Sequence, residues 1–468
     1  MQIRCFCSCI SYIFNNKFIT LVVFLLIVQC VVKLTITTVT PFVIQRRPRL
    51  MRNTPEDHAQ YLYDRVSNAH EPPVDDYDHH EWIRPLELPT GSVAAETFEQ
   101  SIVERSFLQK TKGNRNSADV EKQKRHWNII LLNLTFVMYQ RHWLLVPMDS
   151  KFYSQDNYWT RRLGLSYHPM KTIVDYLKND NLVEYREGKA YKDSPVTARI
   201  SPLPTLTWML WEYFLKIEQP IEPPYLIANT PDDGWEAIQH LPDDHYETQE
   251  LTQINEFLKG QQWACKGPVQ LKYKNNILQG GRLYTPFQGL PDRKIRLRIN
   301  TLINNKPIGE VDFSANHLRL NLAYEKGVDA GATPYEDIGE AAGGVTRVKV
   351  KEFITVAMGA DDAGKAASRC ALTGINGQDF QCLTEAAHRV FPDLDLFTGW
   401  GIHGQNYEGQ ILKQVMLEGI KKDIVCLPVH DAVAVQQEHL KWAEETMLEC
   451  WDRQMETSGL ARVKVDLP

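Results

Sequence analysis

The sequence predicts an α+β fold, in which a helical N-terminal part is followed by a C-terminal part that mixes strands and helices. Three stretches support this prediction. Residues 308–320 (IGEVDFSANHLRL) have the pattern of a strand that turns into a helix, and residues 424–435 (IVCLPVHDAVAV) have that of a β-hairpin. Residues 126–200 have the pattern of several helices followed by two strands. A chain of 468 residues is long enough for two or three domains.

Composition and charge limit the classes of function. The chain is 43% hydrophobic and 24% charged, and its net charge is -6. This acidic balance excludes a uniformly basic nucleic-acid-binding surface, so any such binding must use local patches. The nine cysteines include no CxxC pair, which argues against a zinc ribbon and a disulfide framework. A reduced, cytoplasmic compartment is therefore expected.

The hydrophobic N-terminal segment, residues 1–50, is open to three interpretations. Residues 18–32 form an apolar run between Lys17 and Lys33, which is shorter than the roughly 20 residues of a membrane-spanning helix. The segment is either dispensable upstream sequence ahead of a start at Met51, a membrane anchor, or a cleaved signal. A membrane is expected as a partner only if residues 18–32 are a true anchor.

Residues 51–122 are predicted to form a polar linker, because they are polar and interrupted by prolines. The acidic cluster at 75–81 (DDYDHHE) contains His79 and His80. Adjacent histidines point apart on a helix, so a solvated linker is favoured over a metal site.

Residues 123–205 are predicted to form a winged helix-turn-helix domain. Helices are expected over 127–139, 154–163 and 170–177, and strands over 182–185 and 197–200, which is the element order of that fold. Residues 121–200 hold 13 Lys and Arg residues against 8 Asp and Glu residues. The recognition helix would begin with Tyr167, His168, Lys171 and Thr172, and Arg186 and Lys189 would lie at the tip of the wing. Duplex DNA is the expected partner, and a protein-contact domain is the alternative.

Residues 206–275 are predicted to be a connector, with an aromatic helix over 208–217 and a loop rich in proline and aspartate. The stretch that follows carries the first acid of interest. Val311 and Phe313 alternate with Glu310 and Asp312, and helical spacing begins after Ser314. Asp312 therefore ends a strand beside the N–H groups of a helix, which is a usual place for a metal or phosphate site.

A second acid lies in the predicted hairpin, where His430 and Asp431 occupy the tip. Two carboxylates from separate strands are the least that fixes a divalent cation for phosphoryl transfer. Taken singly, an Asp at a strand end is more often a turn or cap residue.

From Gly280 onward, the chain resembles the palm of family A DNA polymerases and of the phage-type single-subunit RNA polymerases. The resemblance covers about residues 280–468 and rests on five blocks in the family's order. These are GRL at 281–283 with FQGLP at 287–291 and RKIR at 293–296, DFSANHLR at 312–319 (motif A), RVKVK at 347–351 leading to TVAMG at 355–359 (motif B), Gln405 ahead of a helix over 411–420, and VHDA at 429–432 (motif C). The ending RVKVDL at 462–467 is similar to the family's closing palm strand.

The resemblance implies a catalytic pair, Asp312 and Asp431, which with the carbonyl of Phe313 would hold two Mg²⁺ ions, or Mn²⁺ in their place. It places Arg347 and Lys351 on one helix face toward the triphosphate; without the neighbouring blocks, these two cations would be a solvated helix face. The resemblance also implies that His317 and Arg319 bind the nucleotide. Contacts with the primer–template are implied for Arg282, Gln288, Gln405 and His430, although Gln405 alone would be an ordinary surface amide.

Several departures from the family limit the resemblance. Ala432 replaces the second acid of motif C, as in the RNA polymerases, and Met358 precedes Gly359 where the family has a stacking Tyr. The stretch between motifs A and B is short, so the fingers are expected to be reduced. The DNA polymerases carry a Glu at the position of His317, where it crowds the 2′ position of the sugar. A His there can donate a hydrogen bond, so use of ribonucleotides is an open alternative.

The expected architecture is a polymerase-type palm with reduced fingers over residues 276–468, behind the winged helix. The expected activity is template-directed nucleotidyl transfer with nucleoside triphosphates on DNA, in the replication of a phage, plasmid or similar mobile element, alongside other replication proteins. Two alternatives stay open. The first is a non-catalytic initiator or DNA-binding scaffold with a vestigial palm, and the second is a metal-dependent nuclease.

Overall fold

The computed structural model describes residues 80–111, 116–140, 142–155, 157–188, 197–229, 235–237, 244–274, 277, 279–290 and 296–468. Residues 1–50 and 51–468 form two separate units. The predictions for the apolar run 18–32, for most of the acidic cluster at 75–81 and for Lys189 lie outside the described residues. In the described part, helices and strands are mixed, in agreement with an α+β fold.

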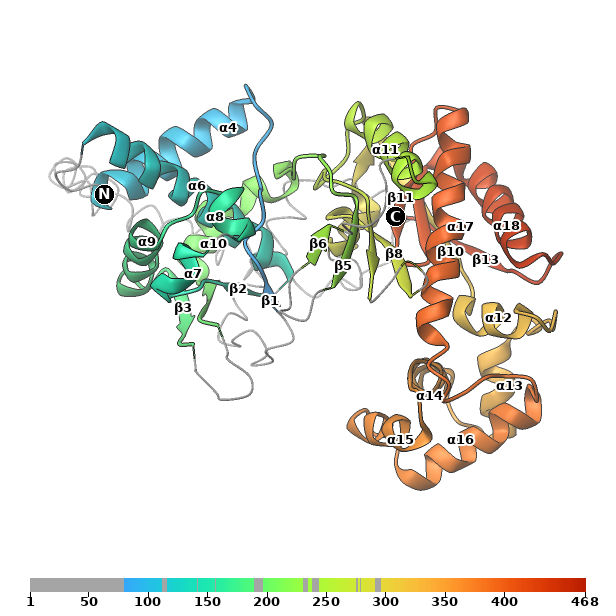
Figure 1. Cartoon of the computed structure of the whole chain (residues 1–468). Coiled ribbons are helices and arrows are strands. Elements are labelled where there is room, and N and C mark those ends of the chain that lie inside the picture. The colour runs from blue at the N-terminus through green and yellow to red at the C-terminus, as the bar shows by residue number, and fades with distance from the viewer. Residues whose placement is uncertain are drawn as a thin grey trace, which may run out of the picture. The chain divides into compact units, whose positions relative to one another are not determined.

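The N-terminal half of the described chain is largely helical, with one small sheet (Figure 1). Its helices are α4 (Val93–Thr97), the π-helix η1 (Phe98–Leu108), α5 (Gln109–Thr111), α6 (Ser117–Gln140), α7 (Ser150–Ser154), α8 (Tyr158–Arg161), α9 (Tyr167–Asn179), α10 (Pro204–Leu210) and the 3-10 helix η2 (Trp211–Lys216). Its strands are β1 (His80–Glu81), β2 (Trp143–Leu145), β3 (Val183–Arg186) and β4 (Arg199–Pro202), in the sheet order β1-β2-β4-β3.

The element order from α6 to β4 agrees with the prediction for a winged helix-turn-helix. Helix α6 is followed by β2, the short helices α7 and α8, helix α9 and the antiparallel pair β3–β4. The helix predicted over 154–163 is shorter than expected, because only α8 lies inside that range, and the separate helix α7 precedes it. Asp149 caps α7 through the N–H of Lys151, and Asn157 accepts a 3.0 Å hydrogen bond from the N–H of Thr160 at the start of α8. Two local caps therefore start two separate helices.

The prediction of a polar linker over 51–122 was wrong for its described part. Residues 93–111 are helical, and Phe98, Val103 and Phe107 are buried. The Phe107 ring stacks on Trp127 of α6 with ring centroids 4.8 Å apart. A few large apolar side chains in a polar stretch are enough to fix it against a neighbouring helix, because each buried aromatic ring removes a large apolar area from water.

The stretch predicted to be a connector also contributes structure. Strands β5 (Leu226–Asn229), β6 (Trp235–Ala237), β7 (Gln270–Tyr273) and β8 (Gly280–Tyr284) form a sheet in the order β6-β5-β7-β8. Helix α11 (Tyr246–Lys259) lies between β6 and β7 in the chain and packs against the long helix α17 (Gly401–Lys421). The parallel pairing of β5 with β7 is a non-local contact that the local pattern does not reveal.

A third sheet, in the order β11-β12-β10-β13, holds the two acids of interest. Strand β10 (Lys306–Phe313) is paired antiparallel with β12 (Ala432–Gln436) on one side and β13 (Val463–Asp466) on the other. Strands β11 (Leu427–Val429) and β12 form the predicted hairpin, and β9 (Leu302–Ile303) pairs antiparallel with the start of β10. The strand-to-helix prediction is confirmed as well, since helix α12 (Asn316–Ala323) follows β10 through Ala315 with φ of 54°.

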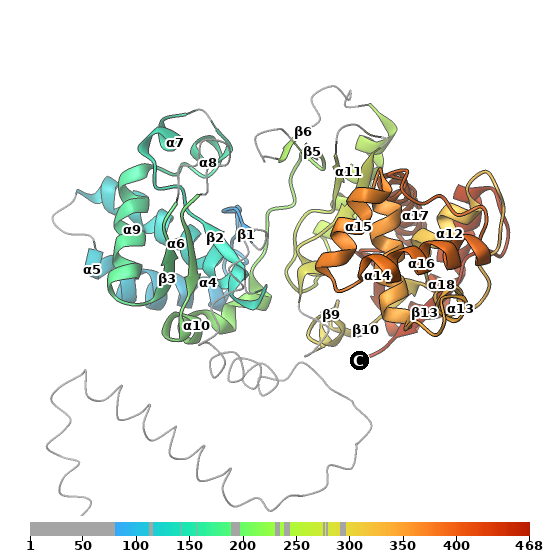
Figure 2. The same ribbon diagram turned by 90° about the horizontal axis from the view of Figure 1, so that it is seen from below.

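Helices cover this sheet and extend beyond it. Helix α18 (Leu440–Met455) packs on α17 and on β10 and β13 (Figure 1). Helices α13 (Pro334–Ala341), α14 (Arg347–Gly359), α15 (Ala363–Leu372) and α16 (Gly377–Val390) lie together near one end of α17 (Figures 1 and 2). The short 3-10 helices are η3 (Phe287–Gly289), η4 (Arg298–Asn300) and η5 (Gln437–His439).

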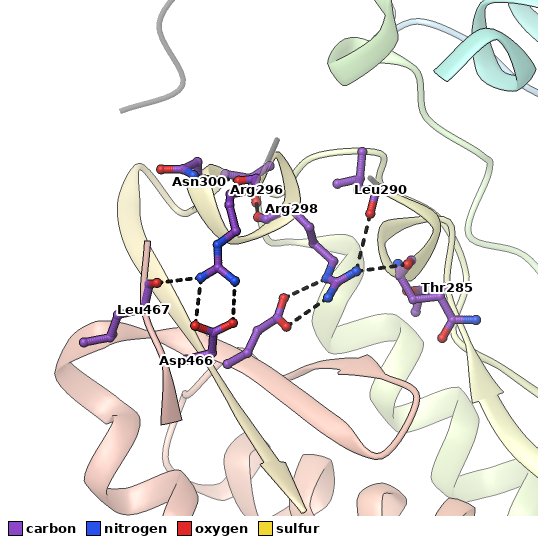
Figure 3. A network of polar contacts seen from close by, with 10 residues as sticks. Thr285, Leu290, Arg296, Arg298, Asn300, Asp466 and Leu467 are labelled. Carbon is purple, nitrogen blue, oxygen red and sulfur yellow. Dashed lines mark hydrogen bonds and ion pairs between the residues drawn. The ribbon is translucent and has the colours of Figure 1, made fainter. Parts of the chain in front are cut away.

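Two arginines attach the segment before β9 to the sheet (Figure 3). Arg296 donates from Nη1 and Nη2 to the carboxylate of Asp466 at 2.7 and 2.8 Å, and Nη2 also donates to the Leu467 carbonyl at 2.7 Å. Arg298 binds Glu310 of β10 at 2.7 and 3.0 Å. Two-point arginine–carboxylate pairs fix orientation as well as distance, so this segment is held in one register on the sheet.

Candidate active site

Asp312 and Asp431 come together because their strands are neighbours. Asp312 of β10 lies opposite Ala432 of β12, so Asp431 lies one residue beyond that pair. The N–H of Phe313 donates to the carbonyl of Asp431 at 3.3 Å, which ties the hairpin tip to the end of β10. His430 is exposed at the tip with φ of 54°, and Asp312 and Asp431 are partly buried. The pairing thus places the two residues at neighbouring positions where adjacent strands end, and the charge of Asp312 acts on the Asp431 carboxyl group.

The charges around these two acids differ. Lys464 of β13 lies opposite Asp312, and its Nζ is 2.8 Å from Asp312 Oδ2. Burial raises the pKa of Asp431 to about 7, and the charges of Glu408 and Asp312 add to that rise. Asp312 is therefore balanced by a cation, whereas the charge of Asp431 is opposed by its surroundings.

This donor set fits a magnesium ion that is completed by its substrate. Among the described residues, no group of three or more His, Cys, Asp or Glu side chains is arranged to hold a metal. Mg²⁺ is usually held in proteins by one or two carboxylates together with water and substrate phosphates, so two acids suffice. The raised pKa of Asp431 is itself a sign of excess negative charge, which a cation would relieve. Asp312, Asp431 and the Phe313 carbonyl are the residues that would hold it.

The predicted cationic helix face is present on α14, where Arg347 and Lys351 are both exposed. Arg347 Nε is 2.9 Å from Glu336 Oε1, and its guanidinium lies 5.5 Å from the ring centroid of Tyr335. Burial raises the pKa of Tyr335 to about 12, while Arg347 lowers it and Asp431 raises it. Arg347 and Asp431 act on the same hydroxyl group, so both face one region.

The rest of α14 differs from the family pattern in a definite way. Met358 is buried and so is absent from the exposed face. That face continues from Lys351 through Thr355 to Gly359, and a Cβ at Gly359 would meet nothing within 4 Å. The exposed face therefore carries cations and small residues, with no aromatic ring among these positions.

Arg282 and His317 converge on a carboxylate that the sequence analysis missed. Arg282 of β8 pairs through Nε with Glu408 Oε1 at 2.7 Å, and Nε2 of His317 lies 3.0 Å from Glu408 Oε2. Glu408 belongs to α17, and its side chain is 1% exposed. A signal was present in the sequence: Glu408 falls in the apolar stripe of α17 formed with Ile411, Leu412 and Val415, where an acid is out of place.

The assignment of Arg319 to nucleotide binding was wrong. Arg319 is 2% exposed, and its guanidinium donates to the carbonyls of Ser314 at 2.8 Å, Leu460 at 3.2 Å and Gly331 at 2.7 Å. A buried arginine whose donors go to backbone carbonyls is part of the core. Its position in motif A gave no indication of this, because the carbonyls come from three separate segments.

The structure gives positions for most of the other residues that were predicted to contact DNA, and these contacts stay predictions. Gln288 lies in η3, half-buried, and its main-chain carbonyl accepts from Arg298 at 3.4 Å. Gln405 lies inside α17 rather than ahead of the helix, because α17 begins at Gly401. In the N-terminal domain, Lys171 pairs with Asp175 at 2.5 Å and Arg186 with Glu184 at 2.8 Å. Lys189 lies outside the described residues, as do residues 293–295 of the RKIR block.

No protein-family model matches the chain, and no curated protein matches it in sequence. One solved structure that matches in part is the POL domain of Pol1 from M. smegmatis in complex with DNA primer-template and dNTP. The identity is 14%, the TM-score is 0.32, and the match covers 47% of this chain and 51% of that one. The chain thus overlaps about half of that polymerase domain, and a TM-score this low carries no argument about activity.

Among the residues that the structure describes, no helix is both long enough and apolar enough to cross a bilayer.

Proposed function

We propose that residues 276–468 catalyse template-directed nucleotidyl transfer from nucleoside triphosphates to a primer strand, with Mg²⁺. The observation that carries the proposal is the pairing of β10 with β12, which sets Asp312 and Asp431 at neighbouring positions where adjacent strands end. The exposed Arg347 and Lys351 of α14 support it, because Arg347 faces the same region as Asp431. Two acids and two cations are the charges that a magnesium-bound triphosphate needs.

In this proposal, the 3′-hydroxyl of the primer passes its proton to water and its oxygen attacks the α-phosphorus, while the bond from that phosphorus to the leaving pyrophosphate breaks. Asp312, Asp431 and the Phe313 carbonyl would hold the Mg²⁺ ions, whose chemistry is to stabilise charge on the attacking and leaving oxygens. Arg347 and Lys351 neutralise the triphosphate and orient it. Lys464 Nζ lies 2.8 Å from Asp312 Oδ2, so a cation held by this carboxylate would compete with the ion pair.

The proposal is tested by primer extension with Asp312→Asn and Asp431→Asn. Each variant keeps the shape of the side chain and removes one charge, so extension should fall by about a hundredfold or more while the protein stays folded. Asp393→Asn is the matched control, because Asp393 is an exposed acid and the chemical change is the same. Near-normal primer extension by folded Asp431→Asn would contradict the assignment of Asp431 to metal binding. Shortening of the primer without nucleotides would indicate a nuclease instead.

The ion pair between Lys464 and Asp312 favours a second candidate, a DNA-binding scaffold whose palm does not catalyse. In a scaffold the ammonium would hold the acid permanently. The two candidates differ in a magnesium titration of thermal unfolding, since a ligand that binds the folded state raises Tm. The polymerase proposal expects Mg²⁺ to stabilise the wild type and to stabilise Lys464→Met at lower concentration. No stabilisation of either protein would support the scaffold.

Sugar choice is the finer part of the proposal, and it concerns His317. The imidazole is 27% exposed at the side of the site, and it can donate as well as accept hydrogen bonds. The alternative expectation is that rNTP is accepted as well as dNTP, because a 2′-hydroxyl can donate a hydrogen bond to a ring nitrogen of His317. Wild type and His317→Glu should be compared with matched nucleotides, and equal rejection of rNTP by the two proteins would contradict the expectation.

A further inference from the structure

Glu408 stands out because it is a buried carboxylate beside a site that already has two acids. Its side chain is 1% exposed, and its charge helps to raise the pKa of Asp431. Taking a carboxylate out of water costs several kcal/mol, and its ion pairs offset this cost only with good geometry. An apolar residue would fill this place in α17 without that cost, so stability alone does not account for an acid here.

The partners of Glu408 come from two other elements. Oε1 pairs with Arg282 Nε of β8, and Oε2 lies 3.0 Å from His317 Nε2, 3.3 Å from Arg282 Nη2 and 3.5 Å from Asn316 Nδ2. Asn316 is itself fixed, since its Oδ1 accepts from Trp451 Nε1 at 3.2 Å. One carboxylate therefore links β8 and the first turn of α12 to α17.

The backbone holds Glu408 at this point. A Cβ added to the next residue, Gly409, would lie 1.8 Å from the carbonyl oxygen of Gly281. Helix α17 thus touches the backbone of β8 directly at the residue before Arg282. This close approach fixes the distance between Glu408 and Arg282 independently of their charges.

The proton on His317 follows from these contacts. Burial alone would raise the pKa of Glu408, but the hydrogen bond from His317 and the charge of Arg282 lower it below its ordinary value. An ionised carboxylate accepts and does not donate. The His317 nitrogen facing it must therefore carry the hydrogen. Arg282 Nη2, 3.1 Å from the same nitrogen, donates to Glu408 instead.

We propose that Glu408 is a positioning residue of the nucleotidyl-transfer site, which holds Arg282 in place and fixes the proton of His317 on Nε2. In the neutral ring, Nδ1 is then an acceptor for a donor group of the substrate. Within the described part of the chain, the polar contacts of His317 all use Nε2, so Nδ1 is available. This inference rests on the proposed function only for the identity of the substrate.

The tautomer is tested without any activity, on the full chain labelled with ¹⁵N-histidine. The long-range ¹H–¹⁵N spectrum should show His317 with hydrogen on Nε2, and the signal is assigned by its loss in His317→Gln. Glu408→Gln keeps the shape but leaves one acceptor oxygen in place of two. With that oxygen taken by Arg282, the amide N–H faces His317, so the hydrogen should move to Nδ1. Glu418→Gln is the matched control on the same helix, because Glu418 lies away from the site and pairs with Lys421. A wild-type ring with hydrogen on Nδ1 only would overturn the inference, even if Glu408→Gln fails to fold.

Kinetics supply the second readout. In folded Glu408→Gln, kcat/KM for nucleotide addition should fall about 10- to 100-fold, as is usual when the partner of a site residue is lost, while Glu418→Gln is unchanged. An unchanged spectrum and unchanged kinetics in Glu408→Gln would contradict the positioning role. If the wild type shows no extension but the tautomer shifts as expected, the proposed function fails and the role of Glu408 toward His317 stands.

Discussion

The carboxylate of Asp431 lies in surroundings that disfavour its negative charge. Burial and the neighbouring charges of Glu408 and Asp312 raise its pKa to about 7, against 3.8 for a free Asp. A group that binds its proton more tightly when folded stabilises the fold while it is protonated, and that stability is lost as pH rises. Catalytic acids that hold cations commonly carry this kind of cost, because the site is shaped for the bound state.

The first residue-scale prediction is that Asp431→Asn stabilises the protein at alkaline pH. Between pH 3.8 and about 7, the folded state keeps a proton that the unfolded state has released, so wild-type stability falls across this window. Above it, the variant should be more stable by about 1–2 kcal/mol, after allowing for the partial exposure of the carboxylate. Thermal unfolding at pH 5 and pH 8.5 without divalent cations measures this, and a variant less stable at pH 8.5 would contradict the pKa argument.

Single residues differ in how far the sequence alone predicts their surroundings. The places of Asp312 at a strand end and of Asp431 at a hairpin tip were predictable, because both are local patterns. Arg319 was not, because its partners Ser314, Gly331 and Leu460 come together only in the folded chain. Glu408 was visible as an acid in an apolar stripe, but its partner Arg282 is supplied by a distant strand.

At the scale of elements, helix α17 depends on a close contact between its own backbone and that of strand β8. Gly409 lets the helix rest on the backbone of β8, where a Cβ would come within 1.8 Å of the Gly281 carbonyl oxygen. The contact is between two backbones, so a flexible side chain cannot move aside to relieve it. Helix α17 also packs on α11, α12, α14 and α18, so a shift at this point reaches most of the C-terminal half.

Gly409→Ala should therefore destabilise the protein, although alanine is the better helix former. Forcing the helix away from β8 costs about 2–3 kcal/mol, as overpacking usually does. Gly377→Ala is the matched control, because a Cβ at the start of α16 would meet nothing within 4 Å. Urea unfolding of both variants provides the comparison. An equal stability for the two variants would show that the helix yields without cost.

Elements with strong local patterns were predictable, and those that depend on partners were not. The alternation in 308–313 and the hairpin at 424–435 correspond to β10 and to β11–β12. Residues 93–111 have a polar composition, so their helices became apparent only through the packing of Phe107 on Trp127. Strands β5 and β7 are short and pair in parallel across α11, which no local pattern reports.

At the scale of the whole molecule, the N-terminal domain is proposed to bind duplex DNA independently of the palm. The order of elements from α6 to β4 supports this, and so does the local excess of basic residues over 121–200. Lys171 and Arg186 are paired with acids on their own elements, so a phosphate must compete with Asp175 and Glu184. Modest affinity is therefore expected.

Binding of the full chain to blunt duplex DNA should weaken steeply as salt rises, because bound phosphates release counterions. Changing Lys171, Arg186 and Lys189 together to Ala should lower both the affinity and the slope of its salt dependence. Three exposed lysines elsewhere, Lys259, Lys421 and Lys441, form the control set for the same charge change. Equal salt slopes for wild type and the first triple variant would favour a protein-contact role for this domain.

The pairing of β10 also determines the stage of folding at which the candidate site forms. Asp312 meets Ala432 and Lys464 only after the chain has closed loops of about 120 and 150 residues, and contacts so distant in sequence form late in folding. Helices such as α16 and α18 need no such closure. A refolding chain should regain its helical signal before any arrangement able to hold a cation exists. The proposed phosphoryl transfer would therefore be absent from partly folded forms, and its recovery would report completed folding.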